Sequence, residues 1–234
     1  PSFKAENAMK HIKHLSVDIG QRVAGFEGEK KAAEYLKKQF EGLGYDVKIQ
    51  EFAIPDRMLG ELRTDIGKIP INVASGSGAT SEDGVTGKVV YAGLGRPEDF
   101  PGEVEGNIAL ISRGELTFAE KVQNAIGRGA IGVILFDNTD SLSPLTPSLG
   151  GAVSIPVVGI RKADGERLLE SLESGEVRAT VTVRLYGNLT SRNVIATRKP
   201  VGIPDPEIVY ITAHYDSVAN SPGANDNASG TSAM

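Results

Sequence analysis

The pattern of apolar runs, glycines and turn signals changes near Ala53 and again near Tyr186. These two changes constrain the fold more than any other feature of the sequence. Between these positions, short apolar runs alternate with glycines and closely spaced turn signals. That pattern is typical of a β-rich α+β module. Outside them, amphipathic segments and single strands indicate an α/β arrangement. The sequence therefore predicts a discontinuous first domain, residues 1–52 and 187–234, interrupted by a second domain at residues 53–186.

The composition excludes several classes of partner. The 234 residues carry a net charge of −5 without a dense Lys/Arg cluster, which argues against nucleic acid and against an anionic membrane surface. A run of about 18 apolar residues, as a membrane span requires, is absent from the sequence. The chain has no cysteine, so any metal ion must be held by histidines and carboxylates.

The first domain is predicted to open with two amphipathic helices and a strand. Helical spacing of apolar residues predicts helices over 2–17 and 29–41, each with a buried stripe. Apolar residues alternate over 45–49, but the phase slips at Phe52 and Ile54, which predicts a bulge or an exit from the sheet. The predicted buried residues are Ala5, Ala8, Met9, Ile12 and Leu15 in the first helix and Ala32, Ala33, Leu36 and Phe40 in the second.

The second domain is predicted to contain six strands and two helices. The clearest strand is 176–186, in which apolar and polar residues alternate. Thr117 is predicted to cap the helix over 117–128, with Glu120 at the spacing of a capping box. The other predicted elements are strands over 69–74, 88–92, 107–112, 130–136 and 155–160 and a helix over 162–174.

The chain then returns to the first domain and reaches the stretch that carries chemistry. After a strand over 193–197 and a Pro-rich turn over 198–206, the β-branched run 208–211 predicts a short buried strand. His214 and Asp216 project to the same side where this strand ends. An imidazole can bind zinc through one nitrogen while a neighbouring carboxylate accepts the other N–H, so the pair reads as a ligand and the group that orients it.

A loop of small residues follows and brings a second carboxylate. Asp226 stands twelve residues after His214, within Gly-Ala-Asn-Asp-Asn-Ala-Ser-Gly. Small neighbours let the backbone approach an ion closely. The block resembles the first metal-binding segment of the M28 family of zinc peptidases, and the segment 22–52 is similar to the opening of the same family. The resemblance implies an α/β peptidase domain, a mixed sheet with flanking helices.

That resemblance also implies an activity and a set of roles. His214 would be a terminal ligand of one of two Zn²⁺ ions, Asp226 the carboxylate that bridges both, and Asp216 the partner that orients His214. The implied reaction is aminopeptidase hydrolysis at the N-termini of peptides or proteins: a glutamate deprotonates the attacking water, and the two zinc ions stabilise the oxyanion. This glutamate and the remaining ligands are expected after Met234, so the 234-residue chain alone is expected to be inactive.

Part of the second domain is similar to the protease-associated (PA) domain. The similarity rests on 106–114, Phe118, Lys121, Ala125 and 129–134. Modules of this type are found inserted in M28 aminopeptidases and other peptidases, where they would cover or shape access to the active site. The sequence of this domain shows no catalytic constellation. Its Arg113 is expected to be salt-bridged at a turn.

Other readings remain open beside the aminopeptidase. The chain could be a non-catalytic PA binding module with an inactive flank, a PA-containing M28 carboxypeptidase, or a receptor-like relative without metals. His11 and His14 stand three residues apart, but neighbouring lysines favour a solvated face over a ligand role. The family resemblance and the start at Pro1 instead of Met predict a processed, secreted protein.

Overall fold

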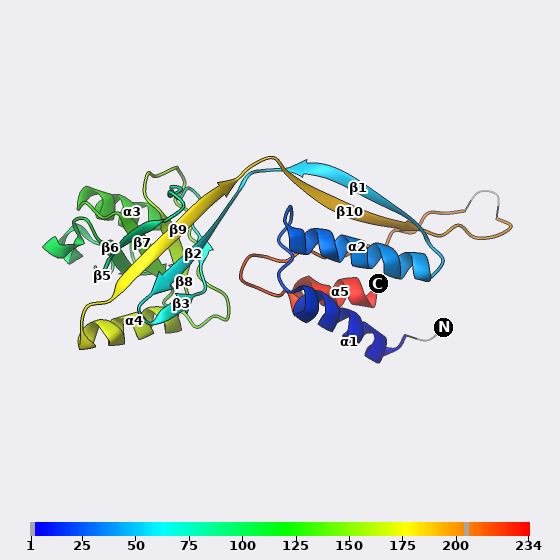
Figure 1. Ribbon diagram of the computed structural model, residues 1–234, viewed down its shortest axis with the longest axis horizontal. Helices are drawn as coiled ribbons and strands as arrows, with labels where there is room; N and C mark the ends of the chain where they lie inside the picture. Colours follow the sequence, from blue (N-terminus) through cyan, green and yellow to red (C-terminus); the bar gives the residue numbers. More distant parts are fainter. Residues whose placement is uncertain (1–2, 204–205) are drawn as a thin grey trace. The chain divides into compact units, whose positions relative to one another are not determined.

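The computed structural model describes residues 3–203 and 206–234, and the chain forms two compact units. Unit 1 comprises Pro1–Asp56 with Gly187–Met234, and unit 2 comprises Arg57–Tyr186. The sequence placed the corresponding boundaries after residues 52 and 186. In Figure 1 the discontinuous unit is coloured from blue to light blue and from dark gold to red, and the continuous unit from cyan through green to yellow.

Unit 2 is built on one mixed eight-stranded sheet in the order β3-β2-β9-β5-β6-β7-β8-β4. The four strands β5, β6, β7 and β8 are parallel to one another. All other pairs in the sheet are antiparallel: β3 with β2, β2 with β9, β9 with β5, and β8 with β4. The strands are β2 (Arg57–Thr64), β3 (Gly67–Ile69), β4 (Asn72–Val73), β5 (Val85–Tyr91), β6 (Ile108–Ser112), β7 (Gly132–Phe136), β8 (Val157–Ile160) and β9 (Arg178–Tyr186).

Both faces of the parallel strands are buried, each under one helix. Alternate residues of β6 belong to two different apolar clusters, Leu110 to one and Ile111 to the other. Helix α3 (Phe118–Gly127) contributes Val122 to the second cluster, and α4 (Lys162–Ser174) contributes Leu168 to the first. The remaining helical turns are η2 (Pro97–Asp99) and η3 (Gly102–Val104). The parallel part of unit 2 is thus a three-layer α/β arrangement.

Two predictions in unit 2 are confirmed in detail. Thr117 caps α3: its hydroxyl accepts from the amide of Glu120 at 3.2 Å, and its own amide donates to the Glu120 carboxylate at 2.8 Å. In β9, the predicted apolar face is buried at Val181 and Val183, while Leu185 near the strand end is 58% exposed.

The single strand predicted over 69–74 is wrong. β3 ends at Ile69 and β4 begins at Asn72, and these two strands lie at opposite edges of the sheet order. Pro70 stands between them, and a proline cannot donate to a ladder, so the chain leaves one edge there. The strand β2 was not anticipated at all.

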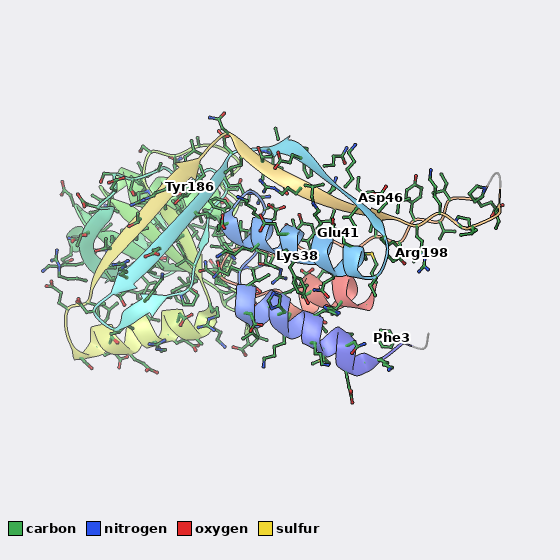
Figure 2. The ribbon with its side chains drawn as sticks, turned by 45° about the vertical axis from the view of Figure 1, so that its right-hand side comes forward. Phe3, Lys38, Glu41, Asp46, Tyr186 and Arg198 are labelled. Carbon is green, nitrogen blue, oxygen red and sulfur yellow. The ribbon has the colours of Figure 1, made fainter. Side chains whose placement is uncertain are left out.

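Unit 1 contains a two-stranded antiparallel ribbon and a helical layer. Strand β1 (Asp46–Ile54) pairs with β10 (Leu189–Thr197). Helix α2 (Glu27–Gly42) packs on both strands, and α1 (Ala5–Lys13) packs on α5 (Ser229–Ala233). A π-helical turn, η1 (His14–Ile19), and the kinked segment η4 (Ala224–Ala228), in which Asp226 and Asn227 have non-helical backbone angles, complete the unit. Asp46 and Arg198 mark the same end of the ribbon in Figure 2.

The sequence predicted the helices of unit 1 but overestimated what they bury. Ala32, Ala33 and Leu36 are buried in α2 as predicted, whereas Phe40 is only half-buried. In the first helix, Leu15 is buried but Met9 is 60% exposed; Ala5 is exposed and Ala8 and Ile12 are half-buried. The predicted start at Ser2 lies outside the described residues.

No bulge interrupts β1 within the described strand. Its register with β10 is continuous from Asp46 opposite Thr197 to Ile54 opposite Leu189. The phase slip at Phe52 instead leaves that side chain 41% exposed. The strand predicted over 193–197 extends back to Leu189, and the predicted turn over 198–206 includes residues 204 and 205, which lie outside the described part.

The buried strand predicted over 208–211 is also wrong. These four residues form no strand in the structure, and their exposed fractions are 74%, 81%, 82% and 72%. An apolar run becomes a strand only where neighbouring strands supply ladder partners. In the described part of unit 1, β1 and β10 pair with each other and neither pairs with this run.

Candidate metal centre

The structure brings together all three residues that the sequence singled out. The Nδ1 atom of His214 lies 3.1 Å from an oxygen of Asp216, and its Nε2 atom lies 2.9 Å from an oxygen of Asp226. The imidazole is therefore flanked by one carboxylate on each nitrogen. The three side chains are 55%, 41% and 81% exposed, in the order His214, Asp216 and Asp226, so the group is open to solutes.

Local contacts tie the loop that carries Asp226 to the segment that carries His214. The hydroxyl of Thr231, in α5, donates to the carbonyl of His214 at 2.9 Å. The side chain of Asn227 accepts from the amide of Gly230 at 3.2 Å, which connects the Asp226 loop to the first turn of α5. Helix α5 thus contacts both the segment that carries His214 and the loop that carries Asp226.

Gly223 is required at the entrance of this loop. Its φ of +55° lies in the left-handed region, where a side chain is strained. A Cβ at this position would lie 2.5 Å from the carbonyl oxygen of Asp226 and 2.7 Å from the Cβ of Ser217. Only glycine leaves room for the backbone to close on itself here.

A fully buried arginine, Arg22, lies beneath the loop. Its Nε donates to the carbonyl of Tyr215 at 2.7 Å, and its Nη2 donates to the carbonyl of Gly223 at 3.0 Å. Its Nη1 faces three further carbonyls, those of Leu15 at 2.8 Å, Gly20 at 2.8 Å and Pro222 at 2.6 Å. Burial lowers the pKa of Arg22, and the negative charge of Asp216 partly offsets this effect.

A second buried polar cluster anchors Tyr215, the residue between His214 and Asp216. Its hydroxyl lies 2.6 Å from Oε1 of Glu29, a fully buried carboxylate. Arg192 pairs with the other oxygen of Glu29 at 3.2 Å, and its backbone amide donates to Oε1 at 3.0 Å. Burial, together with the hydrogen bond and negative charge of Glu29, raises the pKa of Tyr215.

The donor chemistry fits zinc. Imidazole nitrogen and carboxylate oxygen are both ordinary zinc ligands, and a carboxylate on the second imidazole nitrogen fixes the tautomer. Over 3–203 and 206–234 there is no cluster of three or more metal-binding side chains arranged to hold an ion. What the structure shows is one imidazole, that of His214, in contact with the Asp216 carboxylate at one nitrogen and with the Asp226 carboxylate at the other.

Sequence reasoning missed the two buried clusters. In the sequence, Arg22 is only a charged residue in a glycine-containing loop, and Glu29 is only a charged residue in a predicted helix. Neither pattern predicts a buried polar cluster. The other candidates have local partners: His11 faces the Tyr35 hydroxyl at 2.6 Å, and His14 lies 2.9 Å from Asp18. The expected ion pair of Arg113 is confirmed, with Asp137 at 3.0 Å.

Comparison with known proteins agrees with this geometry. Residues 85–168 match the model of the PA domain, and residues 193–234 match the model of peptidase family M28. The chain is 49% identical to aminopeptidase YwaD of Bacillus subtilis over 233 residues, which is 99% of the chain and 50% of that protein. It is 33% identical to leucine aminopeptidase 2 of Arthroderma otae, over 90% of the chain and 43% of that protein.

Solved structures give the same relationship. BSAP, a zinc aminopeptidase from Bacillus subtilis, superimposes with a TM-score of 0.71 at 49% identity, over 99% of this chain and 56% of that one. An aminopeptidase from Aneurinibacillus sp. strain AM-1 gives a TM-score of 0.51 at 38% identity, over 98% and 57%. The chain spans about half the length of the curated relatives it matches. It belongs to peptidase family M28 and carries a PA domain.

Proposed function

We propose that the protein containing this chain is a zinc-dependent aminopeptidase, which releases N-terminal residues from peptides and proteins by two-metal hydrolysis. The observation that supports this most is the placement of His214 between Asp216 and Asp226, at 3.1 and 2.9 Å. The names of the relatives, aminopeptidase and leucine aminopeptidase, support the same activity. They also favour an aminopeptidase over a carboxypeptidase.

In this proposal each of the three residues has one role. His214 binds a zinc ion through Nε2, the nitrogen that faces Asp226, while its Nδ1–H donates to Asp216 and so keeps the ring in one tautomer. Asp226 would hold the zinc ions together with His214, through its carboxylate. When bound, the zinc ions supply Lewis-acid polarisation of the scissile carbonyl and an activated water.

The test compares two ligand variants with a matched histidine control. His214→Ala and Asp226→Ala are expected to abolish chelator-sensitive hydrolysis of aminoacyl substrates and to lower the zinc content measured after dialysis. The control is His14→Ala, which removes an exposed histidine that also pairs with an aspartate, at 2.9 Å. Wild-type activity and zinc content in both ligand variants would overturn the proposal.

We further propose that the enzyme is secreted and acts on peptides without nucleic acid or a membrane as partner. The net charge of −5, without a dense Lys/Arg cluster, argues against a nucleic-acid or anionic-membrane partner. In the described ranges, no helix combines the length and the apolar character needed to cross a membrane. Fractionation of a culture of the source organism is the test: enzyme found with the cells and not in the medium would contradict secretion.

A further inference from the structure

The guanidinium of Arg22 connects three separate stretches of unit 1. Its carbonyl partners lie in η1 and the turn after it (Leu15 and Gly20), between the two residues of the His-x-Asp pair (Tyr215), and at the entrance of the Asp226 loop (Pro222 and Gly223). All of these partners are backbone groups. An arginine has five N–H donors in a rigid plane, so its hydrogen bonds fix distances between the segments as well as holding them together.

The backbone of Arg22 adds a further connection to the segment that contains Tyr215 and Asp216. Its amide donates to the hydroxyl of Ser217 at 2.9 Å, and its carbonyl accepts from the Ser217 amide at 3.1 Å. Ser217 follows Asp216 directly and is buried. The chain on both sides of Asp216, and the chain just before Asp226, is therefore hydrogen-bonded to one residue nearly 200 positions earlier.

We propose that Arg22 is a positioning residue for the metal centre, which sets the separation of His214 and Asp226 before an ion binds. This inference rests on the proposed function, because it assigns these two residues as ligands. Arg22 touches neither ligand side chain in the described contacts and acts through the main chain. Its charge also lies close enough to Asp216 to interact with the carboxylate that orients His214.

A merely structural role predicts something different. Arg22 is fully buried, so removing it will lower the stability of unit 1 in either case. If it only stabilised the fold, molecules that remain folded would bind zinc with unchanged affinity. If it positions the ligands, the folded molecules themselves bind zinc more weakly. Without Arg22, zinc binding must also order the segments that carry His214 and Asp226, and this lowers the affinity.

The experiment measures zinc affinity by competition with a chromophoric chelator, under conditions where circular dichroism shows each variant folded. Arg22→Lys retains the charge but loses the planar set of donors, and we expect a loss of about 10- to 100-fold in affinity. The matched control is Leu36→Ala, which removes a buried side chain of α2 and destabilises unit 1 away from the loop. Its zinc affinity should equal that of the wild type.

Chemical rescue supplies a second readout. Guanidinium ion at millimolar concentration should restore zinc affinity to Arg22→Ala and leave Leu36→Ala unchanged. If both Arg22 variants fail to fold, Ser217→Ala tests the same connection through a smaller change, with a several-fold loss expected. Wild-type affinity in folded Arg22→Lys, or in Ser217→Ala if the Arg22 variants do not fold, would overturn the inference.

His214→Ala, measured in parallel, separates the two proposals. Loss of zinc in His214→Ala together with unchanged affinity in Arg22→Lys would remove the positioning role and keep the proposed function. Undiminished zinc binding in His214→Ala would remove the proposed function itself, and with it the assignment of Arg22.

Discussion

The hydroxyl of Tyr215 lies 2.6 Å from Oε1 of Glu29, a contact between residues 186 positions apart in the chain. Glu29 is fully buried in α2, and Tyr215 separates His214 from Asp216. The contact fixes the outer end of the Tyr215 side chain, while Arg22 holds its carbonyl at 2.7 Å. Tyr215, which lies between His214 and Asp216, is thus held both by its main-chain carbonyl and by its ring hydroxyl.

The Tyr215 hydroxyl is expected to contribute measurably to the stability of unit 1. Tyr215→Phe leaves the buried Glu29 carboxylate without one of its donors, and hydrogen bonds to charged groups contribute about 1.5–3 kcal/mol. We expect a decrease of about that size in the free energy of unfolding, measured in urea. Tyr45→Phe is the control, because that ring is held by contact with Phe40. Equal stabilities for Tyr215→Phe and wild type would refute this account.

The glycine at the loop entrance gives a prediction with a matched control in the same unit. Gly223→Ala meets both a strained φ of +55° and a Cβ position 2.5 Å from the carbonyl of Asp226. Gly44→Ala, just after α2, also meets a positive φ, +81°, but has nothing within 4 Å of its Cβ.

Both alanine variants should therefore lose about 1–2 kcal/mol of stability from strain. Gly223→Ala should lose more than Gly44→Ala and should also bind zinc more weakly, because the clash displaces the Asp226 backbone. Unfolding in urea and chelator competition measure the two effects. Identical results for the two variants would show that the close approach is unimportant.

Asp137 predicts a pH dependence for unit 2. Burial would raise the pKa of its carboxyl, but hydrogen bonds from Arg113, Thr139 and Asn138 outweigh burial and hold the pKa below its ordinary value. The folded pKa is therefore lower than the unfolded value of about 3.9. The stabilisation is fully present above that pH and is lost as the pH falls through the folded pKa.

Asp137→Asn should accordingly destabilise unit 2 at pH 7, by about 1–3 kcal/mol, and the difference from wild type should shrink below about pH 4. Urea titrations at several pH values measure it. Asp140→Asn is the control, since that carboxylate is 91% exposed. A difference that stays constant down to pH 2 would contradict the assignment.

The capping box of α3 gives a prediction for the PA domain. Thr117→Ala removes the oxygen that accepts from the Glu120 amide at 3.2 Å, and loss of such a cap costs about 1 kcal/mol. Glu120→Gln retains an oxygen that can accept from the Thr117 amide and should change stability less. Thermal unfolding of both variants provides the comparison. A larger loss in Glu120→Gln than in Thr117→Ala would contradict the hydrogen-bond assignment.

Local signals made several elements predictable from the sequence. The Thr117 and Glu120 spacing specifies a helix start on its own, and the alternation around Val181 specifies a strand with one buried face. The grouping of His214, Asp216 and Asp226 could also be predicted, because their spacing resembles that of a known family. These features depend on residues that lie near one another in the chain.

The remainder depends on partners that are distant in sequence. Whether Ile208 is buried depends on neighbouring strands, and whether Met9 is buried depends on the elements that pack against its helix; both side chains are exposed in the structure. The role of Arg22 depends on five carbonyls, and no sequence pattern reveals where a carbonyl will point. Buried polar hubs of this kind become visible only once the fold brings their segments together.

The pairing of β1 with β10 implies how unit 1 tolerates its insertion. The ribbon ends with Ile54 opposite Leu189, and β2 pairs with β9 from Arg57 opposite Tyr186. In the connectivity of unit 1, the whole of unit 2 therefore takes the position of the turn that would join β1 to β10 in a hairpin. The module can therefore be exchanged, shortened or lost without moving the ends it connects, and a two-residue Asn-Gly turn between Ile54 and Leu189 would close the same ribbon.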